Sequence, residues 1–387
     1  MGTVKFAELI DFNKGIMNEG NMQPIMHVFK RAMDGEKIVV GFIGGSITQG
    51  SLSSTPETCY AYLVYSWFKK TFPKADIKYV NAGIGGTTSQ FGVARVKQDL
   101  LSHNPDFVLA EFSVNDDNTE HFKETYEGLI RTILRHSPKM ALMVAHNAFY
   151  DTGVSAEDMH LAVAKAYNIP AVSMKNTVVA HVANGDISAP DITPDNLHPN
   201  DDGHALLATL ITNYLEHVLE ALNNGQLDDE TDATNLPAPI TPDTYENSIR
   251  YQNRINGGHL TSVLLEGFEA DGRVQERVSD PFHYGYTSWK KGSKITFEIT
   301  ATNIAAQFKK TIHKPSPVAK ITIDGDDSTS KILDSNFDED WGDCIYIETI
   351  AEGLEKKPHM VTVEIIEDHA DDQVPFYLVS VIGADRE

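Results

Sequence analysis

Cysteine is scarce in this sequence. Only Cys59 and Cys344 occur among 387 residues, and they stand far apart, so we expect no disulfide framework. No apolar run is long enough to cross a bilayer, and the opening stretch MGTVKFAELIDFNKG lacks the apolar core of a signal peptide. These absences predict a cytoplasmic protein without a membrane segment.

Positive charge is also in short supply. Lys and Arg number 32 against 55 Asp and Glu, which gives a net charge of −23. Repulsion makes nucleic acid and anionic membranes poor partners, whereas a neutral small molecule or an oligosaccharide stays compatible as a substrate. The composition does not determine the oligomeric state, and a homo-oligomer is compatible with it.

The first 225 residues alternate short apolar runs with amphipathic stretches. Nearly continuous apolar runs separated by helical patterns predict a parallel sheet with helices on both faces, an α/β architecture. In such sheets ligands bind beyond the carboxyl ends of the strands. A last helix runs towards Gly225, a typical C-terminal stop. The runs expected to be strands are 37–44, 77–83, 106–114, 140–149 and 170–174.

The pattern changes after residue 225. Residues 226–244 are acidic, contain proline and show no periodicity, which is typical of a linker. Residues 245–387 contain many short alternating runs, with turns such as Asp324-Gly325 between them. This part of the chain predicts an all-β antiparallel sandwich as a second domain.

Two glycine-rich stretches invite a nucleotide-binding interpretation, which the residues contradict. Gly45 and Gly50 have the spacing of a phosphate-binding loop, but Ser51 stands where the loop requires lysine. The second stretch, 83–88, lacks the third glycine of the dinucleotide fingerprint. Neither stretch therefore predicts a nucleotide site.

A serine nucleophile explains the first stretch better. Ser46 follows a buried strand and two glycines, and it needs a base and an orienting acid. Asp195 and His198, three residues apart in PDNLHPN, meet both needs, because the carboxylate can accept the Nδ1 proton and leave Nε2 for the serine. We predict a catalytic triad of Ser46, Asp195 and His198.

The same edge of the sheet offers donors for an oxyanion hole. The Ser46 N–H, the N–H of Gly86 and the side-chain amide of Asn115 all follow predicted strands. Each such donor contributes roughly 3 kcal/mol of transition-state stabilisation in other enzymes. We predict that Ser46, Gly86 and Asn115 hold the oxyanion.

Four motifs together resemble the SGNH (GDSL-type) hydrolases. GGSITQG carries Ser46, NAGIGGTTS carries Gly86, EFSVND carries Asn115 and DNLH carries Asp195 and His198, in the order of the family's blocks. The resemblance implies a flavodoxin-like three-layer α/β/α sandwich, a serine esterase mechanism, and neither metal nor cofactor. With the appended sandwich, the chain is similar to bacterial two-domain carbohydrate acetylesterases of the acetylmannan type, whose second domain looks like a carbohydrate-binding module.

Two positions depart from the family's pattern. The first block has glycine at position 45 where aspartate is usual, and Ser113 stands where the third block often has glycine. Neither change removes a predicted donor or proton carrier. Three other polar residues near the motifs, Glu111, Asp116 and His204, are expected to be structural.

The second domain contributes candidate sugar contacts. Trp341 lies among acidic residues and Trp289 lies in YGYTSWKKG, and both could stack on sugar rings. The acidic loop around Trp341 is compatible with calcium binding, but a solvated loop is favoured, and we predict no metal.

The sequence thus predicts a serine esterase that removes O-acetyl groups from a carbohydrate such as acetylated mannan or xylan. The alternatives left open are an esterase or thioesterase for lipid and other acyl chains, and a carbohydrate-binding protein with an inactive hydrolase domain.

Overall fold

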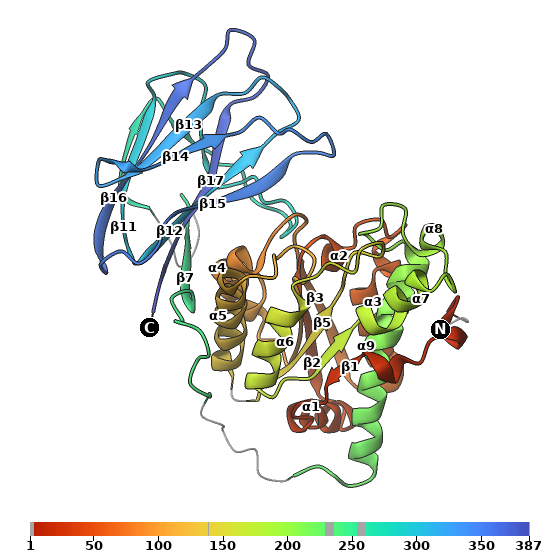
Figure 1. Ribbon diagram of the computed structural model, residues 1–387. Helices are drawn as coiled ribbons and strands as arrows, with labels where there is room; N and C mark the ends of the chain where they lie inside the picture. The colour runs from red at the N-terminus through yellow and green to blue at the C-terminus, as the bar shows by residue number, and fades with distance from the viewer. Residues whose placement is uncertain (1–3, 138, 229–235, 254–259, 387) are drawn as a thin grey trace. The chain divides into compact units, whose positions relative to one another are not determined.

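The computed structural model describes residues 4–137, 139–228, 236–253 and 260–386 (Figure 1). The chain divides into two compact units, Met1–Pro242 and Asp243–Glu387. The division falls within the stretch predicted to be a linker, of which residues 229–235 lie outside the described residues. Within the described residues no helix combines the length and apolar character needed to cross a membrane.

The first unit is built on one sheet with the strand order β1-β6-β5-β4-β2-β3. Each of the five predicted runs forms a strand, and these strands pair in parallel. The strands are β2 (Lys37–Gly44), β3 (Asp76–Gly83), β4 (Phe107–Glu111), β5 (Ala141–His146) and β6 (Ala171–Ser173).

One edge strand of this sheet runs antiparallel. Strand β1 (Ile16–Asn18) pairs with β6 and was not predicted. It has three half-buried residues, too few to show an alternating pattern, and an antiparallel edge strand is common on parallel sheets. The sheet is therefore parallel, as predicted, apart from this one short edge strand.

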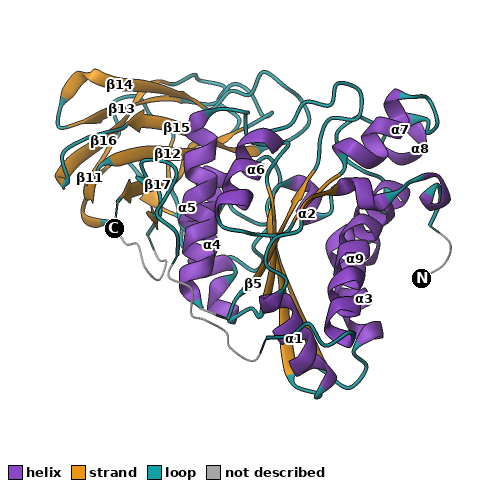
Figure 2. Ribbon diagram, turned by 60° about the horizontal axis from the view of Figure 1, so that its bottom comes forward, coloured by secondary structure: helices purple, strands orange, loops and turns teal. Residues whose placement is uncertain are grey.

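Helices cover both faces of the sheet (Figure 2). One layer holds α4 (Ser89–Asp99), α5 (Glu120–His136) and α6 (Glu157–Ala166). The other holds α1 (Gln23–Met33), α3 (Tyr60–Thr71) and α9 (Asp201–Asn223), whose N-terminus is capped by the Asn200 side chain. This is the predicted three-layer α/β/α sandwich. The remaining helical turns are Ala7–Leu9, Phe12–Gly15, α2 (Ser46–Gln49), Pro56–Thr58, Leu101–His103, Lys175–Val179, α7 (Ala180–Ala183) and α8 (Ala189–Ile192).

The second unit consists of two antiparallel sheets, as predicted. One has the order β14-β13-β16-β11-β8; the other has the order β15-β12-β17-β10-β9, with β7 also paired to β17. Apolar side chains from both sheets form one core. The strands are β7 (Asn247–Tyr251), β8 (Thr261–Glu266), β9 (Glu269–Ala270), β10 (Tyr286–Ser288), β11 (Lys294–Ala301), β12 (Asn303–Lys310), β13 (Val318–Ile323), β14 (Asp326–Asp334), β15 (Cys344–Ala351), β16 (Lys357–Glu367) and β17 (Phe376–Asp385).

The sequence revealed one hairpin turn of this unit but not the strand that follows it. Asp324 and Gly325, with φ of 54° and 72°, both adopt the left-handed conformation of a tight hairpin and join β13 to β14. Strand β14 itself was not predicted, because this edge strand is mostly exposed and polar and lacks apolar alternation.

Candidate active site

The turn after β2 brings the backbone of several elements unusually close together. A Cβ placed on Gly44 would lie 2.1 Å from Oγ1 of Thr48 and 2.4 Å from the carbonyl oxygen of Glu111. A Cβ on Gly45 would lie 1.9 Å from Oδ1 of Asn115. The two glycines are therefore required by close packing, and they leave Ser46 at the first position of α2, beyond the carboxyl end of the sheet.

The structure brings the three predicted triad residues together. Nε2 of His198 lies 2.8 Å from Oγ of Ser46, and Nδ1 lies 2.7 Å from Oδ2 of Asp195. Both distances are within hydrogen-bond range, and the two ring nitrogens serve different partners. The arrangement can carry a proton from the serine to the imidazole while the carboxylate fixes the tautomer.

Asp195 is held in place by the loop that it begins. Its Oδ1 accepts hydrogen bonds from the backbone N–H groups of Leu197 and His198, at 3.0 and 2.7 Å. Asn196, between Asp195 and Leu197, has a left-handed φ of 61°, and its carbonyl accepts a hydrogen bond from the N–H of Tyr150. Partial burial raises the pKa of Asp195, but hydrogen bonds from the His198 side chain and from the loop backbone outweigh it and lower the pKa overall. The carboxylate is therefore kept ionised.

The predicted oxyanion donors lie around the same serine. Asn115 packs against Gly45, the residue before the nucleophile. Gly86 has a left-handed φ of 66°, which favours glycine, and it follows Gly85, where an added Cβ would lie 3.6 Å from Cβ of Ser46. The N–H of Ser46 opens α2 and so has no acceptor inside the helix.

Two residues that the sequence analysis did not single out fix these loops. Oε1 of Gln49 accepts the N–H of Gly85 at 2.5 Å and ties the second glycine loop to α2. Asn81 donates to the carbonyl of Thr48 at 2.7 Å and accepts from the N–H of Gly83 at 2.8 Å. Gln49 and Asn81 lie inside the motifs GGSITQG and NAGIGGTTS, but nothing in those motifs indicates which backbone group each side chain contacts.

The polar residues expected to be structural make structural contacts. Buried Glu111 accepts from both the N–H and the hydroxyl of Ser113, and burial raises its pKa. His204 accepts the N–H of Tyr60 and donates to the carbonyl of Ser51, which links α9 to the loop after the nucleophile. Burial lowers the pKa of His204 to about 4, so the ring is neutral.

The two predicted sugar contacts are exposed side chains of the second unit. Trp289 is 48% exposed and Trp341 is 58% exposed, and the indole of Trp341 donates to Glu339. In the acidic loop, Asp343 is already engaged by Lys309 and by the hydroxyl of Thr311. No group of three or more metal-ligating side chains is found within the described residues.

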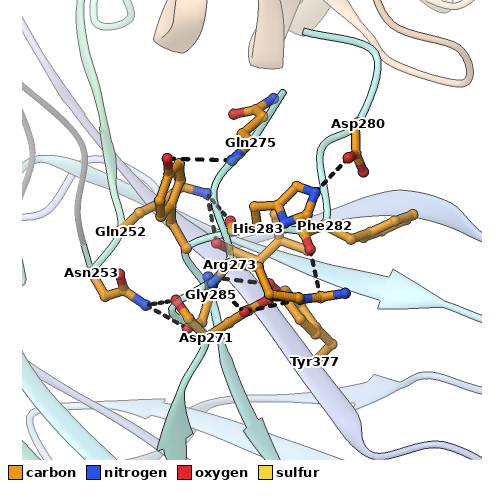
Figure 3. Close-up of polar contacts among 12 residues, drawn as sticks. Gln252, Asn253, Asp271, Arg273, Gln275, Asp280, Phe282, His283, Gly285 and Tyr377 are labelled. Carbon is orange, nitrogen blue, oxygen red and sulfur yellow. Dashed lines mark hydrogen bonds and ion pairs between the residues drawn. The ribbon is translucent and has the colours of Figure 1, made fainter. Parts of the chain in front are cut away.

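A polar cluster in the second unit fastens the segment before β10 to the sheet (Figure 3). Asp271 accepts from the guanidinium of Arg273 at 2.7 Å and from the Tyr377 hydroxyl at 2.6 Å, and Arg273 also donates to the carbonyl of Phe282. Burial alone would raise the pKa of Asp271, but these hydrogen bonds lower it to about 2. The sequence analysis did not identify this cluster.

Replacing Gly45 by alanine tests the packing of the nucleophile turn. The new methyl group would overlap the Asn115 amide, so the amide must move, and we expect kcat for an acetyl ester to fall about 100-fold or more. Steady-state kinetics of Gly45→Ala measure this, and thermal unfolding of the same variant separates a displaced amide from a general loss of stability. A fully active Gly45→Ala protein would mean that the Asn115 side chain can leave its place without cost.

The chain is similar to known ester hydrolases. A sequence profile of the GDSL-like Lipase/Acylhydrolase family matches residues 42–206. The crystal structure of a two-domain esterase active on acetylated mannans, co-crystallised with mannopentaose, is 50% identical in sequence; the match covers 98% of this chain and 99% of that one, with a TM-score of 0.92.

Two curated proteins match part of the chain at lower identity. An acetylxylan esterase of Geobacillus stearothermophilus is 27% identical over an alignment of 145 residues, and the match covers 32% of this chain and 65% of that protein. Thioesterase 1/protease 1/lysophospholipase L1 of Escherichia coli K12 is 26% identical over 183 residues, 45% of this chain and 81% of that protein. The chain thus spans less than two thirds of the length of the acetylxylan esterase.

A serine, histidine and aspartate in sequential hydrogen-bond contact at the edge of a parallel sheet are the arrangement of a serine ester hydrolase. The chain belongs to the GDSL-like lipase/acylhydrolase family, the SGNH hydrolases. The predicted resemblance and the predicted two-domain fold class are confirmed.

Proposed function

We propose that this chain removes acetyl groups from a mannan-type oligosaccharide through an acyl-enzyme on Ser46. The observation that carries the proposal is the unbroken contact from Ser46 through His198 to Asp195. Similarity over the whole chain to an esterase active on acetylated mannans supports the substrate class.

Acylation begins with proton transfer from Ser46 to His198. As Oγ bonds to the ester carbonyl carbon, its proton passes to Nε2, 2.8 Å away, and the ionised Asp195 stabilises the imidazolium. The N–H groups of Ser46 and Gly86 and the Asn115 amide bind the oxyanion. The bond to the sugar oxygen then breaks, and His198 returns the proton to that oxygen.

Deacylation repeats the sequence with water. His198 takes a proton from a water molecule, which attacks the acetyl carbonyl carbon on Ser46. The same donors bind the second oxyanion, and the bond to Oγ breaks. The proton returns to Oγ and acetate leaves, so the enzyme is restored without any other reactant.

The second unit is proposed to contact the sugar chain. Trp341 and Trp289 are large aromatic side chains left about half exposed, and such rings stack on the C–H faces of sugars. Replacing one at a time by alanine should raise KM for an oligosaccharide more than for a small chromogenic acetate.

Acetate release distinguishes the candidate substrates. We expect faster release from acetylated manno-oligosaccharides than from acetylated xylo-oligosaccharides, and faster cleavage of a p-nitrophenyl acetate than of the octanoate. Rates that rise with acyl length would instead indicate an acyl-chain esterase or thioesterase. No release from any ester, with binding to manno-oligosaccharides intact, would indicate a carbohydrate-binding protein.

A further inference from the structure

A buried carboxylate directly follows one of the proposed oxyanion donors in the chain. Asp116 follows Asn115 in the turn after β4, where the N–H groups of both residues donate to the carbonyl of Phe112 at 3.0 Å. Its side chain is fully buried. An ionised carboxylate in such a place costs free energy unless hydrogen bonds compensate for the lost water, so its contacts are informative.

Each oxygen of this carboxylate contacts a different helix. Oδ1 accepts the N–H of Ser89 at 2.8 Å, at the first residue of α4. Oδ2 lies 3.0 Å from Nε2 of His160 on α6. Ser89 stands three residues after Gly86, so a single carboxylate joins the turn that carries Asn115 to the end of the loop that carries Gly86.

His160 has the features of a dedicated partner for this carboxylate. Its ring is fully buried and stacks on the ring of Tyr126, with centroids 3.7 Å apart and an interplanar angle of 8°. Within the described residues its Nδ1 has no hydrogen-bond partner, so Asp116 is the polar contact of the ring. Nε2 therefore carries the ring proton, and this N–H donates a hydrogen bond to Oδ2.

We propose that Asp116 and His160 form a positioning pair that sets the separation between the two loops bearing the proposed oxyanion donors, Gly86 and Asn115. The inference rests on the proposed function of those donors. Neither member of the pair touches the substrate. Their effect is geometric, because a displacement of about 1 Å in a catalytic constellation can cost about 100-fold in rate.

Two substitutions of His160 separate positioning from packing. His160→Phe keeps the ring that stacks on Tyr126 but removes the donor, whereas His160→Gln keeps an N–H donor and loses the ring. We expect His160→Phe to lower kcat for an acetyl ester about 10- to 100-fold with KM within about twofold. His160→Gln should recover most of that loss. Phosphonylation of Ser46 by a fluorophosphonate should slow in His160→Phe in the same proportion as kcat.

A matched control uses the neighbouring buried histidine. His146 is also fully buried, with its ring centroid 6.0 Å from that of His160, and within the described residues its ring nitrogens form no hydrogen bond. His146→Phe should keep the kcat of the wild type. Full activity of His160→Phe together with a defect in His160→Gln would overturn the proposal, because it would assign the residue a packing role.

A double-mutant cycle covers the case in which His160→Phe does not fold. Asp116→Ala and His160→Leu, which removes the ring donor, should each lower kcat about as much as expected for His160→Phe, and the double variant should lose no more than either single variant. Independent, multiplying losses would overturn the proposal. Wild type and Ser46→Ala are assayed alongside. An inactive wild type or an active Ser46→Ala protein would contradict the proposed function. If the wild type is active and Ser46→Ala is not, full activity of the Asp116 and His160 variants would contradict only the positioning pair.

Discussion

Ser46→Ala is expected to lower kcat for an acetyl ester by about a million-fold, to the level left by binding and the oxyanion donors. Without Oγ no acyl-enzyme can form, and His198 then has no serine proton to accept. The change removes one oxygen atom from a serine that contributes little to the core, so the unfolding temperature should stay close to that of the wild type. Initial rates and thermal unfolding measure both quantities.

The control for this substitution is Ser102→Ala. The Ser102 hydroxyl donates to the backbone carbonyl of Gln98, so the change removes one hydrogen bond. It does not touch the relay, by which we mean the hydrogen-bonded chain Ser46–His198–Asp195. We expect full activity in the control. Turnover by Ser46→Ala at more than about a thousandth of the wild-type rate would show that another group performs the attack.

Asp195→Asn is the second large expected effect, a loss of about 10⁴-fold in kcat with KM nearly unchanged. The amide can present its NH₂ group to Nδ1 of His198 and so favour the tautomer with the proton on Nε2. That nitrogen then cannot accept the proton of Ser46. The loss of negative charge also removes the stabilisation of the imidazolium.

The chain offers a matched control for the aspartate. Asp186 accepts from His181 at 2.9 Å in another His–Asp pair of the first unit, one that is not part of the relay. Asp186→Asn should leave kcat unchanged. If Asp195→Asn lost less than about tenfold, His198 would not depend on this carboxylate, and the relay as described would be wrong.

The sequence predicted the sheet and the residues of the relay for a clear physical reason. Strands such as β2 are buried over nearly their whole length, so their apolar runs stand out, and functional residues follow the ends of such strands. Ser46, Asp195 and His198 lie in motifs that are local in sequence, and the structure places their side chains in contact. Their catalytic roles remain predictions.

What the sequence could not reveal is which distant residues contact one another, even where a residue lies inside a motif. Gln49 reaches Gly85, and Asp116 reaches His160, across 36 and 44 positions of the chain. No periodicity marks such pairs, because each depends on the packing of separate elements around the sheet. Short or exposed strands such as β1 and β14 were not predicted, because they contain too few buried apolar side chains to show a strand pattern.

The most direct measurement is the identity of the acylated residue. The enzyme is mixed with a chromogenic acetate ester, quenched in acid during the first turnovers, and digested for peptide mass mapping. The account predicts one added acetyl group on the peptide that contains Ser46, absent from Ser46→Ala and most abundant in the early quench. An acetyl group on another residue, or turnover without any acetylated peptide, would contradict it.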